Sequence, residues 1–172
     1  MRGVSAGLLG CVLAVVGCGD DDDDFDASPT AVGGTYALQL VNGPDSCGFG
    51  GWKEGESTGN VPLTVTQNDT ALVGQVGQSG ASFVLGLLLG TATFKGEIHG
   101  GALKLTALGD RRKQKSCEVQ WQVALDAQTT DAGFNGTLTF TPQIDLPDNA
   151  DCQPLVGCSA TQTLAAVRTT TP

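Results

Sequence analysis

Cysteine is the residue type whose positions in this chain point most directly to chemistry. Among the 172 residues there are six: Cys11, Cys18, Cys47, Cys117, Cys152 and Cys158. No two of them form a Cys-x-x-Cys pair, the usual start of a structural zinc site. The chain also has a single His, His99, which argues against a His-rich metal site. We therefore expect no metal and no cofactor, so the cysteines must serve another chemistry.

Residues arranged for catalysis are scarce. Glu97 lies two residues before His99, so in a strand both side chains share one face and form a candidate acid–base pair. No Ser or Cys nucleophile motif accompanies this pair. A later loop holds three further acids, Asp145, Asp148 and Asp151. They lack the Gly-centred frame of a calcium-binding loop. We expect all these residues to be exposed, and we predict that the protein is not an enzyme.

Residues 1–17 have the pattern of an export signal. Arg2 is followed by an uncharged and mostly apolar stretch to Gly17, which is too short for a membrane span of about 20 residues. The stretch ends in Val15-Val16-Gly17-Cys18, which resembles the lipobox of bacterial lipoproteins. This resemblance implies that Cys18 is acylated and becomes the first residue of the mature chain. A second match ends at Cys11 but leaves too short an apolar region, and an ordinary signal peptide with an incidental Cys is the other alternative.

Acidic residues follow this cysteine at once. Five Asp residues at 20–24 and Asp26 account for six of the 18 acids behind the net charge of −9. Because like charges repel and resist burial, we expect residues 18–34 to form an extended tether. The acidic balance also argues against nucleic-acid binding. Position +2 is Gly19, whereas inner-membrane retention in lipoproteins uses Asp there, so we expect an outer-membrane anchor. The face of the membrane stays open.

The four remaining cysteines are even in number, which in an exported chain predicts two disulfides. Three pairings are compatible with the sequence. The favoured one joins Cys152 to Cys158 across a short loop and Cys47 to Cys117 across about seventy residues.

Period-two hydrophobic patterns recur from residue 35 to residue 169. In one segment Phe94, Gly96 and Ile98 alternate with polar residues, and the segment 117–126 alternates in the same way. Such patterns predict eight or nine strands, with Gly100-Gly101 as a hairpin turn and 109–116 as a basic turn. We expect residues 35–172 to form one all-β domain, an antiparallel up-and-down meander closed as a barrel, with a β-sandwich as the alternative.

Short motifs in this region resemble small Gram-negative lipoproteins with lipocalin-like or avidin-like meanders. The motifs are Gly34-Thr35-Tyr36, LTVTQND at 63–69, FKGEIHGGALKLT at 94–106 and FNGTLTF at 134–140. The resemblance covers about residues 33–169 and implies a barrel that binds a small molecule. Tyr36 stands where lipocalins usually carry Trp.

Aromatic and basic residues are the candidates for binding. The ligand-binding candidates are Tyr36, Trp52, Phe94 and Trp121, although these rings could equally fill the core. The anion-binding candidates are Arg111, Arg112, Lys113 and Lys115, which could instead form a solvated hairpin tip. The apolar run 83–89 is either core or the wall of a cavity.

The expected function is therefore that of a lipid-anchored envelope protein, without enzymatic activity, that binds a small apolar ligand or another envelope component. The alternative is a structural or interaction lipoprotein with a filled core.

Replacement of the predicted lipid acceptor tests the anchor. We expect Cys18→Ala to abolish fatty-acid labelling and to leave the precursor uncleaved, because the thiol must accept the diacylglycerol before the signal peptidase acts. Metabolic labelling in the native host provides the measurement, with Cys11→Ala as the matched control that keeps the label. Unchanged labelling of Cys18→Ala would contradict the prediction.

Overall fold

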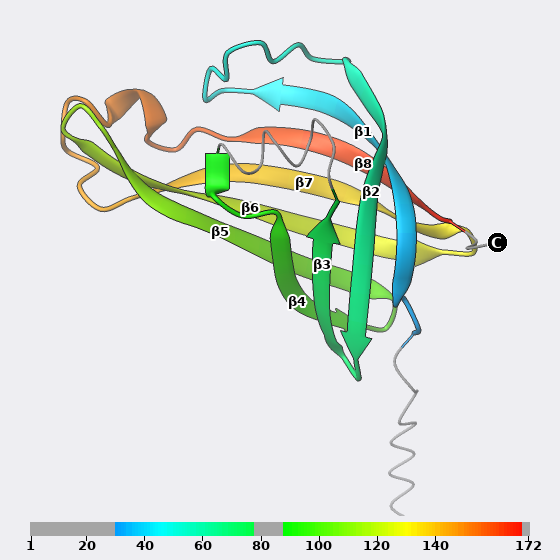
Figure 1. Ribbon diagram of the computed structural model, residues 1–172. Helices are drawn as coiled ribbons and strands as arrows, with labels where there is room; N and C mark the ends of the chain where they lie inside the picture. Colours follow the sequence, from blue (N-terminus) through cyan, green and yellow to red (C-terminus); the bar gives the residue numbers. More distant parts are fainter. Residues whose placement is uncertain (1–29, 78–87, 170–172) are drawn as a thin grey trace, which may run out of the picture.

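The computed structural model describes residues 30–77 and 88–169, which form a closed antiparallel barrel of eight strands (Figure 1). The strands are β1 (Gly34–Asp45), β2 (Ser57–Asn68), β3 (Ala71–Val76), β4 (Thr93–His99), β5 (Ala102–Gln114), β6 (Cys117–Thr130), β7 (Gly133–Ile144) and β8 (Ala160–Arg168). A short 3-10 helix, η1 (Gln153–Leu155), precedes β8. The predicted signal peptide, Cys18 and most of the tether lie outside the described residues.

Each strand pairs with its neighbours in sequence, and β8 returns to pair with β1. The closing ladder runs from Tyr36 opposite Arg168 to Asp45 opposite Ala160. The up-and-down barrel is therefore confirmed, and the sandwich alternative is not observed. Closure satisfies the backbone hydrogen bonds of both terminal strands, which would otherwise be open edges.

Side chains alternate between the interior of the barrel and its outer surface, as the period-two patterns predict. In β4, Phe94 and Ile98 are buried, while Lys95 and Glu97 are exposed. In β6, alternate residues from Cys117 to Ala127 are buried. Apart from Cys117, the buried apolar side chains of all eight strands belong to one core cluster inside the barrel.

The turn after β4 is the predicted two-residue hairpin. Gly100 and Gly101 have φ angles of 54° and 84°, a conformation in which a side chain would be strained. The predicted basic turn at 109–116 is wrong, because β5 continues through it to Gln114 and the chain reverses at Lys115, where φ is 55°. The pairing of β5 with β6 continues beyond a register shift between Leu108 and Arg111.

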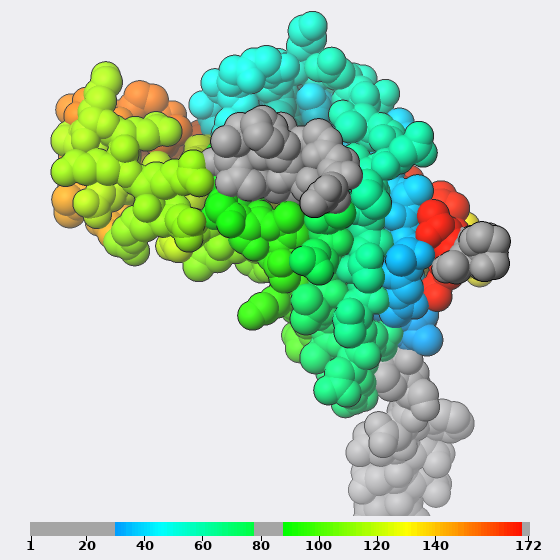
Figure 2. Space-filling view, in the orientation of Figure 1, coloured from blue at the N-terminus to red at the C-terminus, as the bar shows by residue number. Residues whose placement is uncertain are grey.

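The two ends of the barrel differ in their connections. One, which we call the short-turn end, carries the β2–β3, β4–β5 and β6–β7 turns together with the start of β1 and the end of β8. The other, the long-loop end, carries the β1–β2 loop, the β5–β6 hairpin and the β7–β8 loop with η1. The last two project together beyond the barrel, and form a separate lobe in the space-filling view (Figures 1 and 2).

Two disulfides tie the long-loop end, which confirms the predicted number but not the favoured pairing. Cys47 bonds to Cys158, and Cys117 bonds to Cys152. Cys47 follows β1 and Cys158 precedes β8, so the β1–β8 pairing brings them together across a sequence separation of 111. The favoured pairing was wrong because the proximity of these cysteines depends on barrel closure, which spacing does not reveal.

The two bonds should contribute unequally to stability. In the chain-entropy model, the separations of 111 and 35 residues correspond to about 5 and about 4 kcal/mol of unfolding free energy. We expect the double variant Cys47→Ala/Cys158→Ala to lose more stability than Cys117→Ala/Cys152→Ala, as measured by urea unfolding. A non-reducing peptide map checks the pairing itself, and a peptide joining Cys152 to Cys158 would contradict the structure.

Candidate functional site

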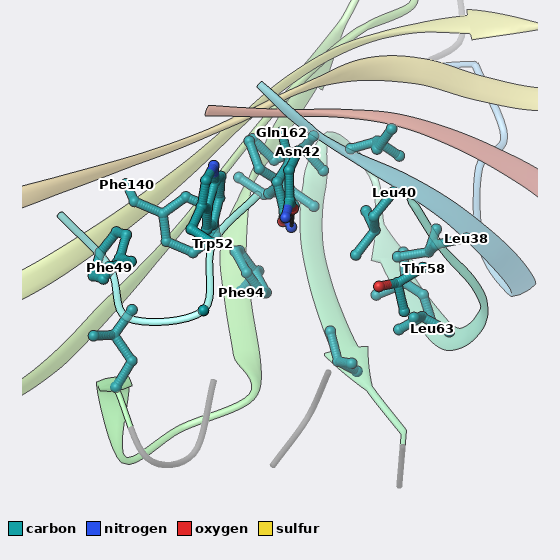
Figure 3. A pocket seen from close by; sticks show the side chains of 18 of the residues that line it. Leu38, Leu40, Asn42, Phe49, Trp52, Thr58, Leu63, Phe94, Phe140 and Gln162 are labelled. Atoms are coloured by element: carbon teal, nitrogen blue, oxygen red, sulfur yellow. Dashed lines mark hydrogen bonds between the residues drawn. The ribbon is translucent and has the colours of Figure 1, made fainter. Parts of the chain in front are cut away.

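A cavity of about 540 Å³ occupies the barrel interior and reaches the long-loop end (Figure 3). This volume lies within the range of about 300–1,000 Å³ that is usual for small-molecule sites. The described residues that line it are Leu38, Leu40, Asn42, Phe49, Gly50, Gly51, Trp52, Thr58, Val61, Leu63, Val76, Leu88, Phe94, Leu105, Leu125, Phe134, Leu138, Phe140, Gln162 and Leu164.

The wall of this cavity is aliphatic and aromatic, with three polar side chains. These are Asn42, Thr58 and Gln162. None of the lining residues in the described part of the chain is ionisable. The described wall therefore offers apolar contact and a few hydrogen bonds, and none of its residues is a charged partner for an ionic group.

Two of the polar side chains form a pair across neighbouring strands. Asn42 on β1 lies opposite Gln162 on β8, and Gln162 Nε2 donates a hydrogen bond of 2.7 Å to Asn42 Oδ1. Both are in phase with inward-facing leucines, Leu40 on β1 and Leu164 on β8. The pair therefore belongs to the inner surface of the barrel.

The β1–β2 loop brings two aromatic rings to the cavity. The Asp45 carboxylate accepts hydrogen bonds from the backbone N–H groups of Cys47, Gly48 and Phe49, at 2.8, 3.1 and 2.7 Å. The Trp52 indole N–H donates to the carbonyl of Gly43 at 2.8 Å. Together with the Cys47–Cys158 disulfide, these bonds fix the loop before a ligand arrives.

The rings form an aromatic cluster at the long-loop end. Phe49 lies 5.8 Å from Trp52 and 4.8 Å from Trp121, measured between ring centroids, and Trp52 packs edge-on to Phe140 at 5.8 Å. Figure 3 shows Trp52 and Phe140 side by side along the cavity. Tilted and edge-on contacts of this kind stabilise the rings beyond their burial alone.

Of the predicted ligand-binding residues, Trp52 and Phe94 line the cavity. The other two do not, which corrects that part of the expectation. Trp121 is buried and packs against Phe49, but it is not among the residues that line the cavity. Tyr36 lies beyond Phe134, at a ring-centroid distance of 5.0 Å, near the short-turn end.

Tyr36 instead holds the short-turn end closed. Its hydroxyl donates to the carbonyl of Val32 at 2.7 Å and accepts a bond from Arg168 at 2.9 Å. Val32 is itself buried, so the chain before β1 folds across this end of the barrel. Arg168 also donates to the carbonyls of Gly33 and Ala31. Burial raises the pKa of Tyr36, an effect that the nearby Arg168 partly opposes.

The predicted anion-binding residues lie at the projecting end of the β5–β6 hairpin. All four are exposed. Arg111 forms an ion pair with Asp145. Arg111, Arg112 and Lys113 follow one another in β5, so their side chains alternate between opposite faces. The structure thus does not gather them on one surface, and their anion-binding role stays a prediction.

The remaining candidates have local partners. Glu97 Oε2 lies 3.2 Å from His99 Nε2, and both side chains are more than half exposed. Hydrogen bonds from Ser116 hold the pKa of Asp151 below its usual range. Within residues 30–77 and 88–169 no cluster of His, Cys, Asp and Glu is arranged to hold a metal ion. The same residues include no helix long and apolar enough to cross a membrane.

Phe49, Asn42 and Gln162 are site residues that the sequence reasoning missed. The pattern did contain a signal for the amide pair, because both residues occupy positions where the alternation predicts an apolar side chain. Phe49 carried a weaker signal, as an aromatic residue in a Gly-rich loop beside Cys47. Of the apolar run 83–89, residues 83–87 lie outside the described residues, while Leu88 lines the cavity and Leu89 is buried.

No protein-family model matches this chain, and no curated protein or solved structure is significantly similar to it. Its function must therefore be inferred from the barrel and the cavity themselves.

Loss of the Tyr36 hydroxyl should weaken the short-turn end. We expect Tyr36→Phe to cost about 1–2 kcal/mol of unfolding free energy, because the Val32 carbonyl and Arg168 each lose a buried partner. Urea unfolding measures the loss.

Tyr36 is the only Tyr of the chain, so its phenolate absorbance can be followed directly. The folded phenol keeps its proton to higher pH than the unfolded one, whose pKa is about 10. Its contribution to stability is therefore present below about pH 10 and is lost as the pH rises above that value. The stability difference between wild type and Tyr36→Phe should shrink over this range. A native phenol that titrates at or below the unfolded pKa would contradict the assignment.

Proposed function

We propose that this protein is a lipid-anchored envelope protein, without enzymatic activity, that binds a small apolar ligand inside its barrel. The observation that carries the proposal is the cavity of about 540 Å³, whose wall is formed mainly by Leu, Val, Phe and Trp side chains. Burial of apolar ligand surface in such a site contributes roughly 25 cal/mol per Å² before the costs of association.

Preorganisation of the long-loop end supports binding. A disulfide and the Asp45 hydrogen bonds fix the loop that supplies Phe49 and Trp52. A ligand that enters a preformed site loses less free energy to the ordering of the protein than one that must fold a loop around itself.

The position of the described N-terminus fits an anchor at Cys18. Residues 30–33 meet the barrel at its short-turn end (Figure 1). The aromatic cluster lies at the opposite, long-loop end. A tether attached at the short-turn end leaves the long-loop end free to face the aqueous phase, from which a ligand or an envelope partner can arrive. We propose the outer membrane as the location, on the ground of Gly19 at position +2.

The competing proposal is a structural or interaction lipoprotein with a filled core. Natural interiors are packed to about 0.75 of their volume and contain few voids larger than a water molecule. A cavity of about 540 Å³ is not expected of a core whose only purpose is packing. This contrast favours the binding proposal.

Filling the cavity tests the proposal. We expect the purified protein to enhance the fluorescence of the neutral dye N-phenyl-1-naphthylamine, and Leu164→Trp to reduce that binding at least about tenfold, since the larger ring occupies ligand space. The matched control is Val167→Trp, on the same strand but with an exposed side chain. Thermal unfolding verifies that both variants fold. Equal dye binding by the two variants, or no binding by the wild type, would contradict the proposal.

A further inference from the structure

We infer that the ligand is an uncharged, largely apolar molecule with one hydrogen-bonding group, such as a hydroxyl, which the Asn42–Gln162 pair receives. This inference rests on the proposed function, because it specifies the chemistry of the molecule that the cavity takes. Figure 3 shows the two amides together beside Trp52, among apolar side chains.

The amide pair has unused hydrogen-bonding capacity. Its internal bond takes one N–H of Gln162 and one lone pair of Asn42. Two N–H groups on Asn42 Nδ2 and the Gln162 carbonyl oxygen find no further partner among the described residues. If the oxygen and nitrogen positions of both side-chain amides are exchanged, one internal bond still forms and unused N–H groups and an unused oxygen remain. The pair therefore presents a donor and an acceptor in either orientation. A hydroxyl, which both donates and accepts, matches this arrangement.

The other polar groups of the wall are less suited to this task. The Trp52 N–H is already bonded to Gly43, which leaves its ring as an apolar surface. Thr58 lies on β2 opposite Leu40, one inward position from Asn42, and it is exposed whereas the two amides are half-buried. The ligand's polar group is therefore directed to one part of the wall, where β8, β1 and β2 lie side by side and the amide pair is the more buried partner.

The absence of ionisable lining residues in the described part of the chain sets the charge of the ligand. An ionic group loses its hydration on entry, and without a countercharge that loss is not recovered. Two neutral amides stabilise a carboxylate or an ammonium much less than a salt bridge would. A neutral molecule is consequently preferred over a charged one of the same length.

Displacement of N-phenyl-1-naphthylamine by three dodecyl compounds tests the inference. The experiment uses the mature chain with Cys18→Ser, a substitution outside the barrel. Without the lipid anchor, the protein is handled without detergent. The pH is about 8, where dodecanoate and dodecylammonium are both ionised. We expect the dissociation constant of dodecanol, measured by displacement of the dye, to be at least about tenfold lower than that of either ion. We expect Asn42→Leu/Gln162→Leu to weaken the binding of dodecanol about fivefold or more, because the hydroxyl loses its partners, while binding of the dye itself is retained.

The control is a second amide pair outside the cavity. Gln143 donates to Gln122 at 3.3 Å on exposed parts of β7 and β6, so Gln122→Leu/Gln143→Leu should leave the affinity for dodecanol unchanged. If the inner pair only joins β1 to β8, its double variant will lose thermal stability yet keep the wild-type affinity for dodecanol, which overturns the inference. Equal or tighter binding of either ion also overturns it but leaves the proposed function intact. Failure of the wild type to bind the dye removes the proposed function and the inference together.

Discussion

The hydrogen-bonded seam between β1 and β8 is the constraint on which the rest of the structure depends. It turns a meander of eight strands into a closed barrel with an interior. Side-chain interactions reinforce this seam along its length. Arg168 bonds to Tyr36 at the short-turn end, Gln162 bonds to Asn42 at the cavity, and the Cys47–Cys158 disulfide joins the chain just beyond the long-loop end. The first and last strands are thus held by contacts between residues more than 100 positions apart.

The cavity follows from how the interior is occupied along the barrel axis. Near the short-turn end, Tyr36 and Phe134 pack against each other, and the Tyr36 hydroxyl bonds to the carbonyl of the buried Val32. Toward the long-loop end, the rings of Phe49 and Trp52 stand at the wall because their loop is fixed by Asp45 and a disulfide. The space between these two groups is lined mainly by leucine and valine. Since each group is anchored to backbone, neither can collapse freely into that space.

Much of the fold is predictable from local pattern alone. Alternation in segments such as Phe94–Ile98 follows from the two-residue period of a strand, and Gly100-Gly101 follows from the positive φ angles of a tight hairpin. Prediction failed where a non-local contact decides. The segment 109–116 reads as a charged turn, yet it continues β5, because pairing with β6 persists past the barrel. Cysteine pairing failed for the same reason, since closure of the barrel chooses the partners.

The sequence by itself determined an all-β meander, because the two-residue hydrophobic period of a strand is a local pattern. It also determined that the barrel domain has four cysteines and several aromatic residues, because these depend on residue type alone. Only the tertiary structure decided which rings face a cavity. Tyr36 and Trp121 are as aromatic as Trp52 and Phe94, but Tyr36 packs against Phe134 near the short-turn end, and Trp121 packs against Phe49 without lining the cavity. It likewise paired Asn42 with Gln162, since residues 120 positions apart meet only when the last strand closes on the first.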